Sequence, residues 1–271
     1  MINRCSDGIP VKNGVLKMNI SELWRFPVKG LKGESLKEVA ITPNASFPLD
    51  RHFALAHGGS GITYESPKWA LKTEFHMLMH DSDEHLSKLT PHFDETSRLL
   101  TILRDGAEET RTFVDDPDGQ VEINRYFERL LGKPNSTIEP QFVQALDFQF
   151  GNIEEPVISL INLASVRQLS ETIGKHVDVA RFRGNIIIDG ASPWEERDWV
   201  NRTVTINDAT FVVVDETIRC GATVVNPDTC ERDLNIPKLL QQNYGHMFCG
   251  VYLIAKQEGT ISSDASISVS K

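Results

Sequence analysis

Short runs in which apolar and polar residues alternate recur along the chain, and this pattern is typical of strands with one buried face. In the first half, these runs cover Ile20–Phe26, Leu36–Thr42, His52–Ala56, Arg98–Leu103 and Glu109–Val114. In the second half, they cover Phe142–Ala145, Val157–Asn162, Arg183–Ile188, Thr203–Ile206, Thr210–Thr217 and Phe248–Ala255. Asp105-Gly106 lies between the last two runs of the first half and predicts a hairpin turn.

Segments with helical spacing are fewer, and each is short. The expected helices cover residues 82–89, 117–131, 163–173 and 236–243. The clearest has Pro117 in its first turn and stops at Gly132, as helix boundaries often do. Because strands and helices do not alternate regularly, a doubly wound parallel sheet is not expected. The pattern predicts an α+β, mainly β fold with two β-rich, barrel-like domains and a few short helices.

The domain boundaries are predicted from changes in this pattern. Residues 1–17 are expected to form a flexible N-terminal extension, and Met18 is a second candidate for the translation start. The sequence GKPNSTIEP, at 132–140, reads as a connector. The first domain is therefore expected over 18–135, the second over 136–262, and a tail over 263–271.

The charge of the chain is acidic but uneven. Lys and Arg number 28 against 38 Asp and Glu, a formal net charge of −10. Residues 81–118 contain eleven acidic and four basic residues, so this acidic stretch carries −7 and the remainder only −3. The average argues against nonspecific binding to nucleic acid. It is compatible with a small cationic pocket elsewhere.

Several classes of protein are not supported by the sequence. The chain has neither a secretory signal pattern nor an apolar run long enough to span a membrane. Its four cysteines are too few for a disulfide scaffold, so a cytoplasmic location is expected. The motifs G-x-G-x-x-G, Walker A, G-x-S-x-G and H-E-x-x-H do not occur.

Three separated segments combine cations with a cysteine. They are FPVKG followed by Asp50-Arg51, RFRGN over 181–185, and TIRCGAT followed by NPDT over 217–229. Arg181 and Arg183 alternate, so on one strand their side chains would share a face and bind one anion. Arg219 precedes Cys220, and a neighbouring cation favours the thiolate, which binds soft metals or acts as a nucleophile.

Two other interpretations of the cysteines remain open. Cys220, Cys230, His246 and Cys249 have the ligand types of a zinc site, although their spacing is irregular. Alternatively, Cys220 carries a persulfide and transfers sulfur. An unremarkable role as an apolar core residue is also common for a cysteine that ends an apolar strand.

The three segments resemble landmarks of one family. LWRFPVKG and LDRHFAL are similar to the start of the N-terminal β-barrel domain that accompanies MOSC domains. RFRGNIIIDG, PWEE, RCGATVVNPDT and RDLNIP are similar to the MOSC domain itself. The resemblance covers about residues 18–260. Two-domain relatives include the mitochondrial amidoxime-reducing component and bacterial reductases of N-hydroxylated compounds.

The resemblance implies a molybdenum cofactor of the molybdopterin type. It makes Cys220 the molybdenum ligand, and it places Lys29, Arg51, Arg183 and Asn185 on the pterin and its phosphate. It adds Arg181, Arg219 and Thr223 to the cofactor-binding set. Asp228 is the candidate for proton delivery, although a turn role in Asn226-Pro227-Asp228 is the simpler interpretation.

The sequence departs from the family pattern at three positions. Gly30 and Ile218 stand where relatives often have serine, and Cys230 stands where they usually have glycine. No cysteine cluster has iron–sulfur spacing. The resemblance therefore implies an oxidoreductase that reduces N-hydroxylated small molecules with electrons from a separate ferredoxin- or flavin-type protein. A noncatalytic carrier of the cofactor or of sulfur is the alternative, and the acidic stretch is a hypothetical docking face for a basic electron donor.

Overall fold

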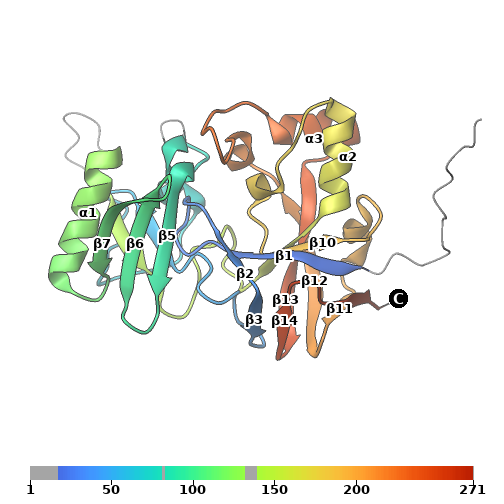
Figure 1. The fold of residues 1–271 in the computed structure, drawn as a ribbon, viewed down its shortest axis with the longest axis horizontal. Helices are drawn as coiled ribbons and strands as arrows, with labels where there is room; N and C mark the ends of the chain where they lie inside the picture. The colour runs from blue at the N-terminus through green and yellow to red at the C-terminus, as the bar shows by residue number, and fades with distance from the viewer. Residues whose placement is uncertain (1–17, 81–82, 132–138, 271) are drawn as a thin grey trace, which may run out of the picture.

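The computed structural model describes residues 18–80, 83–131 and 139–270, and within them the chain forms fifteen strands and three α-helices. The predicted extension 1–17 and most of the connector lie outside these residues. Figure 1 shows the two halves side by side, with the first half around α1 and the second around a large sheet. The predicted α+β, mainly β fold is confirmed.

The large sheet has eight strands and curls into a half-barrel. In order across the sheet they are β15 (Ile267–Val269), β11 (Thr203–Ile206), β12 (Ala209–Ile218), β13 (Phe248–Gln257), β9 (Ile158–Asn162), β10 (Ile186–Asp189), β1 (Asn19–Arg25) and β2 (Glu34–Leu36). Only the β9–β10 pair is parallel. The strands β1 and β2 come from the start of the chain. The two halves are therefore joined by the hydrogen bonds between β1 and β10 in addition to the connector.

Apolar residues pack on both faces of this sheet. Ile158 and Leu160 of β9 join the core inside the half-barrel, together with Phe211 and Leu253. Ile161 points the other way, into a second core covered by α2 (Leu163–Ile173) and α3 (Ile236–Tyr244). All five residues of β9 are therefore buried, including the polar residues Ser159 and Asn162.

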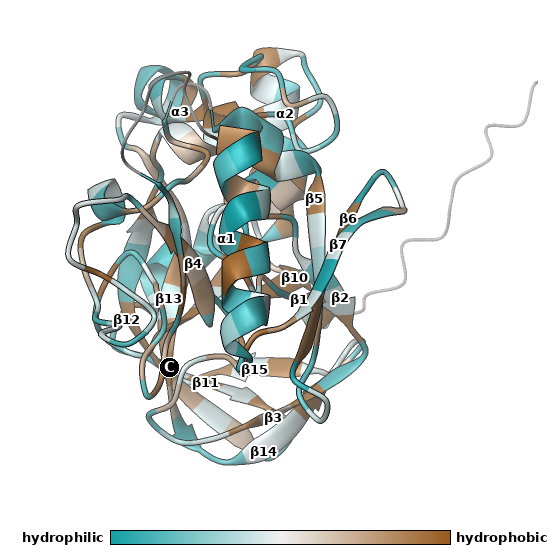
Figure 2. Cartoon of the chain, turned by 90° about the vertical axis from the view of Figure 1, so that its left-hand side faces the viewer, coloured by the Kyte–Doolittle hydropathy of each residue, from teal (hydrophilic) through white to brown (hydrophobic). Residues whose placement is uncertain are grey.

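The first half is built from smaller sheets and one amphipathic helix. Its elements are the sheet β5 (Leu89–Asp94), β6 (Leu99–Arg104) and β7 (Ala107–Phe113), the strand β4 (Phe53–Ala56) and α1 (Pro117–Leu131). The strand β8 (Gln141–Gln144), which was expected to belong to the second half, pairs with β4 of the first half. Ile123 and Phe127 of α1 are fully buried against the β5–β7 sheet. Figure 2 shows α1 in front of the strands, with much of its outer surface hydrophilic. A further ribbon, β3 (Glu38–Ile41) with β14 (Gly259–Ser262), again joins the two halves.

Most of the expected elements form within one or two residues of their predicted bounds, and three need correction. The helix expected over 82–89 is the 3₁₀ helix η2 (Glu84–Lys88), and Leu89 begins β5, a strand that was not predicted. The run Leu36–Thr42 breaks at Lys37 into β2 and β3, which pair with different partners. The run Arg183–Ile188 is strand only from Ile186, and the residues before it form the 3₁₀ helix η3 (Val179–Phe182). The predicted tail contains β15, which pairs with β11 at the edge of the large sheet.

The acidic stretch forms β5–β7 and the start of α1. Three of its acidic residues pair with arginines of the same stretch, in the pairs Arg98–Asp115, Arg104–Glu109 and Arg111–Glu108. Part of its excess charge is therefore neutralised locally. Among the described helices, none combines the length and the apolar character that crossing a membrane requires.

Candidate functional site

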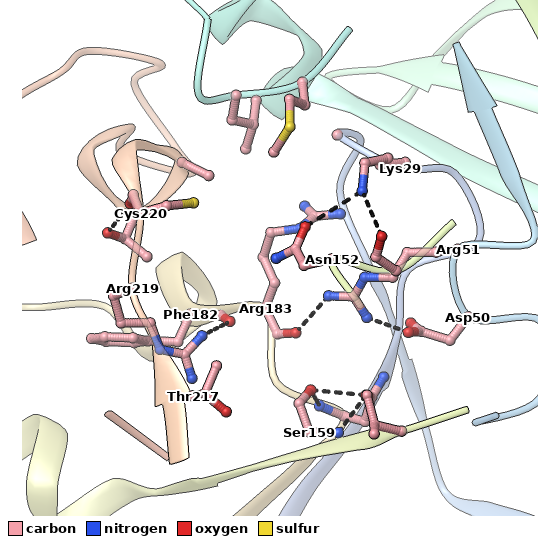
Figure 3. Close-up of a pocket in the computed structure, with 18 of the residues that line it drawn as sticks. Lys29, Asp50, Arg51, Asn152, Ser159, Phe182, Arg183, Thr217, Arg219 and Cys220 are labelled. Atoms are coloured by element: carbon pink, nitrogen blue, oxygen red, sulfur yellow. Dashed lines mark hydrogen bonds and ion pairs between the residues drawn. The ribbon is translucent and has the colours of Figure 1, made fainter. Parts of the chain in front are cut away.

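A cavity lies between the two halves, and residues from both line it. Its charged lining consists of the cations Lys29, Arg51, Arg181, Arg183 and Arg219 and a single carboxylate, Asp50, within the described part of the chain. Figure 3 shows Cys220 on one side of the cavity, Lys29 and Arg51 on the other, and Arg183 between them. The structure therefore brings together residues 191 positions apart in sequence (220 − 29).

Lys29 is held just beyond β1 by the neighbouring strand. Val28 forms a parallel bridge with Phe53, and the Lys29 N–H donates to the Phe53 carbonyl at 2.8 Å. The Lys29 ammonium donates to the Phe150 carbonyl at 2.8 Å, to the Gly151 carbonyl at 3.4 Å and to Asn152 Oδ1 at 3.5 Å. The segment after β8 thus fixes the Lys29 ammonium at the wall of the cavity. Lys29 is only 5% exposed.

Arg51 and Arg183 form a second cationic group around the Phe26 ring. Their guanidinium carbons lie 5.1 and 4.2 Å from the centre of that ring. Arg51 pairs with the Asp50 carboxylate and donates to the Arg183 carbonyl at 3.0 Å. Arg183 Nη1 donates to the Leu31 carbonyl at 2.6 Å. Its Nη2 is buried and has no partner.

Burial, together with neighbouring charges, lowers the pKa values of Lys29 and Arg183. Burial, followed by the charges of Arg51 and Arg183, lowers the pKa of Lys29 to about 7. Burial, followed by Arg51, lowers the pKa of Arg183 to about 9. Buried cations are ordinarily paired, and Asp50 is here the one carboxylate among five lining cations. An anionic ligand would supply the missing countercharge, so the residues present fit a phosphorylated group.

This electrostatic arrangement predicts a pH-dependent affinity for a simple anion. Sulfate does not titrate near neutrality, whereas the Lys29 ammonium loses its proton above a pKa of about 7 in the unliganded protein. Above that pH, sulfate binding must be accompanied by proton uptake, so the affinity is expected to fall by up to about tenfold per pH unit. Calorimetric titration of the ligand-free protein from about pH 6 to about pH 8 measures this fall in affinity. Lys29→Met should bind sulfate weakly at every pH. A variant that keeps the wild-type pH dependence would contradict the assignment to Lys29.

Cys220 follows β12 and starts the 3₁₀ helix η5 (Gly221–Val224). Its thiol is free, and its residue is partly exposed. Thr223 Oγ1 donates to the Cys220 carbonyl at 2.8 Å. The Arg219 guanidinium is turned into the protein, where Nε donates to the Cys249 carbonyl at 2.7 Å and Nη1 to the Phe182 carbonyl at 2.9 Å. These bonds fix the backbone on both sides of the cysteine.

The expectation that Arg181 and Arg183 share one face of a strand is wrong. Asp178 caps η3 by accepting from the Ala180 N–H, and Arg183 ends it in the left-handed region at φ 52°. The two side chains therefore diverge. Arg181 makes two hydrogen bonds to Asp233, at 2.7 and 2.8 Å, and bonds the Val224 carbonyl at 3.1 Å, so it holds η5 in place.

Asn185 and Asp228 were also predicted to belong to the site, and the structure places them differently from each other. Asn185 Oδ1 accepts from the Ser159 N–H and hydroxyl at 3.0 and 2.8 Å, and its Nδ2 donates to the Trp24 carbonyl. Asn185 lines the cavity but ties β1 to β9. Asp228 belongs to a turn in which its N–H donates to Asn226 Oδ1 at 2.9 Å, and it lines a neighbouring, more apolar cavity rather than the one with Cys220. The predicted roles of Arg181, Asn185, Arg219, Thr223 and Asp228 in cofactor chemistry stay predictions.

The four-residue zinc site does not form. Over the described residues, no three His, Cys, Asp or Glu side chains are placed to hold a metal ion. Cys249 is fully buried, and burial raises its pKa to about 12. Cys230 Sγ lies 2.8 Å from Ser87 Oγ, and His246 lies between the Tyr244 and Phe248 rings. The interpretation of these residues as a zinc site is therefore wrong.

Sequence reasoning missed part of the lining. Gln149, Asn152 and Thr217 face the cavity, and two of them keep a buried polar atom without a partner. Gln149 and Asn152 lie between β8 and β9, in a segment without a chemical motif, so only the fold shows their location. Thr217 lies three residues before Cys220, where its position in the motif was a usable signal.

Three features together define the class of this protein. They are its β-rich fold, its division into two halves, and a cysteine that faces a cationic cavity between those halves. Residues 17–134 match the model of the MOSC N-terminal beta barrel domain, and residues 145–268 match that of the MOSC domain. The chain is a MOSC-domain protein with the N-terminal β-barrel domain, as the sequence motifs predicted.

Similar proteins include curated molybdenum cofactor sulfurases. The chain is 26% identical over 245 residues to that of Caenorhabditis elegans, which covers 86% of this chain and 33% of the relative. It is 32% identical over 127 residues to that of Anopheles gambiae, covering 42% of this chain and 16% of the relative. The chain thus spans about one third or less of these relatives' length. Among solved structures, the YuaD protein of Bacillus subtilis is similar with a TM-score of 0.43, 11% identity and coverage of 93% and 95% of the two chains.

Proposed function

We propose that the chain binds a molybdenum cofactor in the cavity between its halves and uses it to reduce N-hydroxylated small molecules. The observation that carries this proposal is that a free thiol and several buried cations line the same cavity. A thiolate is a suitable ligand for a soft metal, and the cations offset the negative charge of a phosphorylated pterin. Membership of the MOSC family, related to the molybdenum cofactor sulfurases, supports the choice of cofactor.

The residues of the chain have separate parts in this proposal. Lys29, Arg51 and Arg183 would hold the phosphate and the pterin, and Cys220 would hold the metal. When bound, the cofactor supplies two-electron redox chemistry and accepts an oxygen atom. Arg219 and Thr223 keep the Cys220 backbone in one position through the hydrogen bonds described above, so the ligand is preorganised.

The overall reaction balances as a two-electron reduction. The N–O bond of the substrate breaks, two electrons and two protons are taken up, and the reduced nitrogen compound and water are released. In this proposal the electrons come from a separate ferredoxin- or flavin-type protein. Docking of that protein on the acidic stretch remains a prediction.

The proposal is tested by purifying the wild-type chain from a host that makes the cofactor. Near-stoichiometric molybdenum and pterin are expected, measured by elemental analysis and by fluorescence of the oxidised pterin. Turnover of an amidoxime with a chemically reduced viologen dye then distinguishes an enzyme from a carrier. Cofactor content without turnover would favour the carrier. Protein without molybdenum and pterin, whatever the cofactor supply, would refute cofactor binding. Cyanide-labile sulfur on Cys220 would then favour the sulfur carrier.

A further inference from the structure

Unpartnered polar atoms are concentrated around the cavity. Four buried side-chain nitrogen or oxygen atoms without a hydrogen-bond partner belong to residues that line this cavity. They are Gln149 Oε1, Thr217 Oγ1, Arg181 Nε and Arg183 Nη2. Because buried polar groups are nearly always paired, this concentration indicates a ligand that supplies the missing partners.

The Gln149 amide offers this ligand an acceptor that has no partner in the protein. Its Nε2 donates to the Val157 carbonyl at 3.1 Å, which fixes the orientation of the amide. Its Oε1 is left buried on a residue that is 3% exposed. The nearby Lys29 ammonium already donates to the Phe150 carbonyl and the next two residues. An oxygen in this position requires an N–H or O–H of the ligand.

Thr217 offers a second buried contact on the other half of the chain. It lies near the end of β12, three residues before Cys220, and is 3% exposed. Figure 3 shows it on the same side of the cavity as Arg219, apart from Lys29 and Arg51. A hydroxyl both donates and accepts, so it can pair with a ring nitrogen or with its proton.

We infer that Gln149 and Thr217 recognise an N–H-bearing group of the ligand whose anionic part is held by Lys29, Arg51 and Arg183. This inference rests on the proposed function and identifies two residues to which the family resemblance assigned no role. The N–H could come from two sources. One is the amino-substituted pterin ring of the cofactor, and the other is the amidine or hydroxylamine nitrogen of the substrate. The two sources make different predictions for cofactor retention and for KM.

Gln120 provides a matched control within the same chain. Its Nε2 also donates to a carbonyl, that of Val114, and its buried Oε1 is also unpartnered. It lies on α1, away from the residues that line the cavity. Gln120→Met and Gln149→Met therefore remove the same chemical groups, and only the second alters the cavity.

The experiment compares Gln149→Met, Thr217→Val, Thr217→Ser and Gln120→Met, each purified with the wild type from the cofactor-producing host. If the pterin supplies the N–H, Gln149→Met and Thr217→Val should bind pterin about tenfold more weakly, which is the effect of one hydrogen bond. Both variants should therefore lose pterin during dialysis. If the substrate supplies the N–H, pterin content should match the wild type while KM for an amidoxime rises about tenfold. Thr217→Ser should resemble the wild type in both cases, and so should Gln120→Met.

Two results would overturn the inference, and they differ from failure of the proposed function. If wild type and all four variants hold the same pterin and have the same KM, Gln149 and Thr217 do not contact the ligand. If Thr217→Val lowers the melting temperature of cofactor-free protein while Thr217→Ser does not, the hydroxyl has a protein partner instead. Wild-type protein without pterin and molybdenum would refute the proposed function, and the inference with it.

Discussion

Replacing Cys220 with alanine is expected to remove molybdenum from the purified protein while leaving pterin bound. The cations proposed to hold the phosphate come from other segments, so the organic part of the cofactor should keep its contacts. Loss of an outer-shell partner of a metal site commonly costs up to about 100-fold in affinity or activity, and loss of a direct ligand should cost at least as much. Elemental analysis and amidoxime turnover with the viologen donor measure the effect.

Cys230→Ala is the control for the Cys220 substitution. Cys230 is also a free, partly exposed cysteine, but its Sγ contacts Ser87 Oγ and it does not line the cavity. It should keep wild-type molybdenum and turnover. Equal molybdenum in Cys220→Ala and wild type would show that the thiol is not a ligand, and equal losses in both variants would indicate a general effect on the fold.

Gly250→Ala is expected to destabilise the fold strongly. Gly250 has φ 81° in β13, and a Cβ there would overlap the Leu160 carbonyl oxygen of β9. Left-handed strain and overpacking each cost about 1 to 3 kcal/mol, so the free energy of unfolding should fall by about 2 to 6 kcal/mol. Denaturant titration of cofactor-free protein measures it. The Cβ would also lie 3.2 Å from Arg219 Nη2, so the substitution disturbs the support of Cys220.

Gly245→Ala separates the two contributions. Gly245 has a similar φ of 77° after α3, but no atom lies within 4 Å of the position its Cβ would take. It should therefore cost only about 1 kcal/mol, the price of the left-handed conformation. If Gly250→Ala were no worse than Gly245→Ala, the β9 and β13 backbones would tolerate the side chain and the close approach would be unimportant.

Much of the fold could be predicted from local patterns. The hairpin at Asp105-Gly106 and the helix after Asp116 form where the sequence indicates. Gly174 ends α2 in the left-handed region. These features depend on a few neighbouring residues, on turn chemistry and on which face is apolar.

Two features could not be predicted in the same way. They are the pairing of distant strands and the choice between a strand and a 3₁₀ turn at Arg183. Alternation placed Arg183 on a strand, but Asp178 caps a 3₁₀ turn that ends at Arg183 and redirects both arginines. The sequence also carries no sign that β1 and β2 complete the sheet of the other half. Pairing partners that lie far apart in sequence are decided by the shape and packing of the whole core.

By itself, the sequence determined the class of fold, the family and the residues of the cationic motif segments, because these are written in short segments with specific chemistry. Only the tertiary structure decided which of those residues face a common cavity. It turned Lys29, Arg51, Arg183 and Cys220 toward one space. It engaged Arg181, Asn185 and Arg219 in bonds to the protein itself. It also brought Gln149 to the cavity from a segment without any motif. The physical reason is that a buried polar group must find a partner, and the fold alone determines which partners are near.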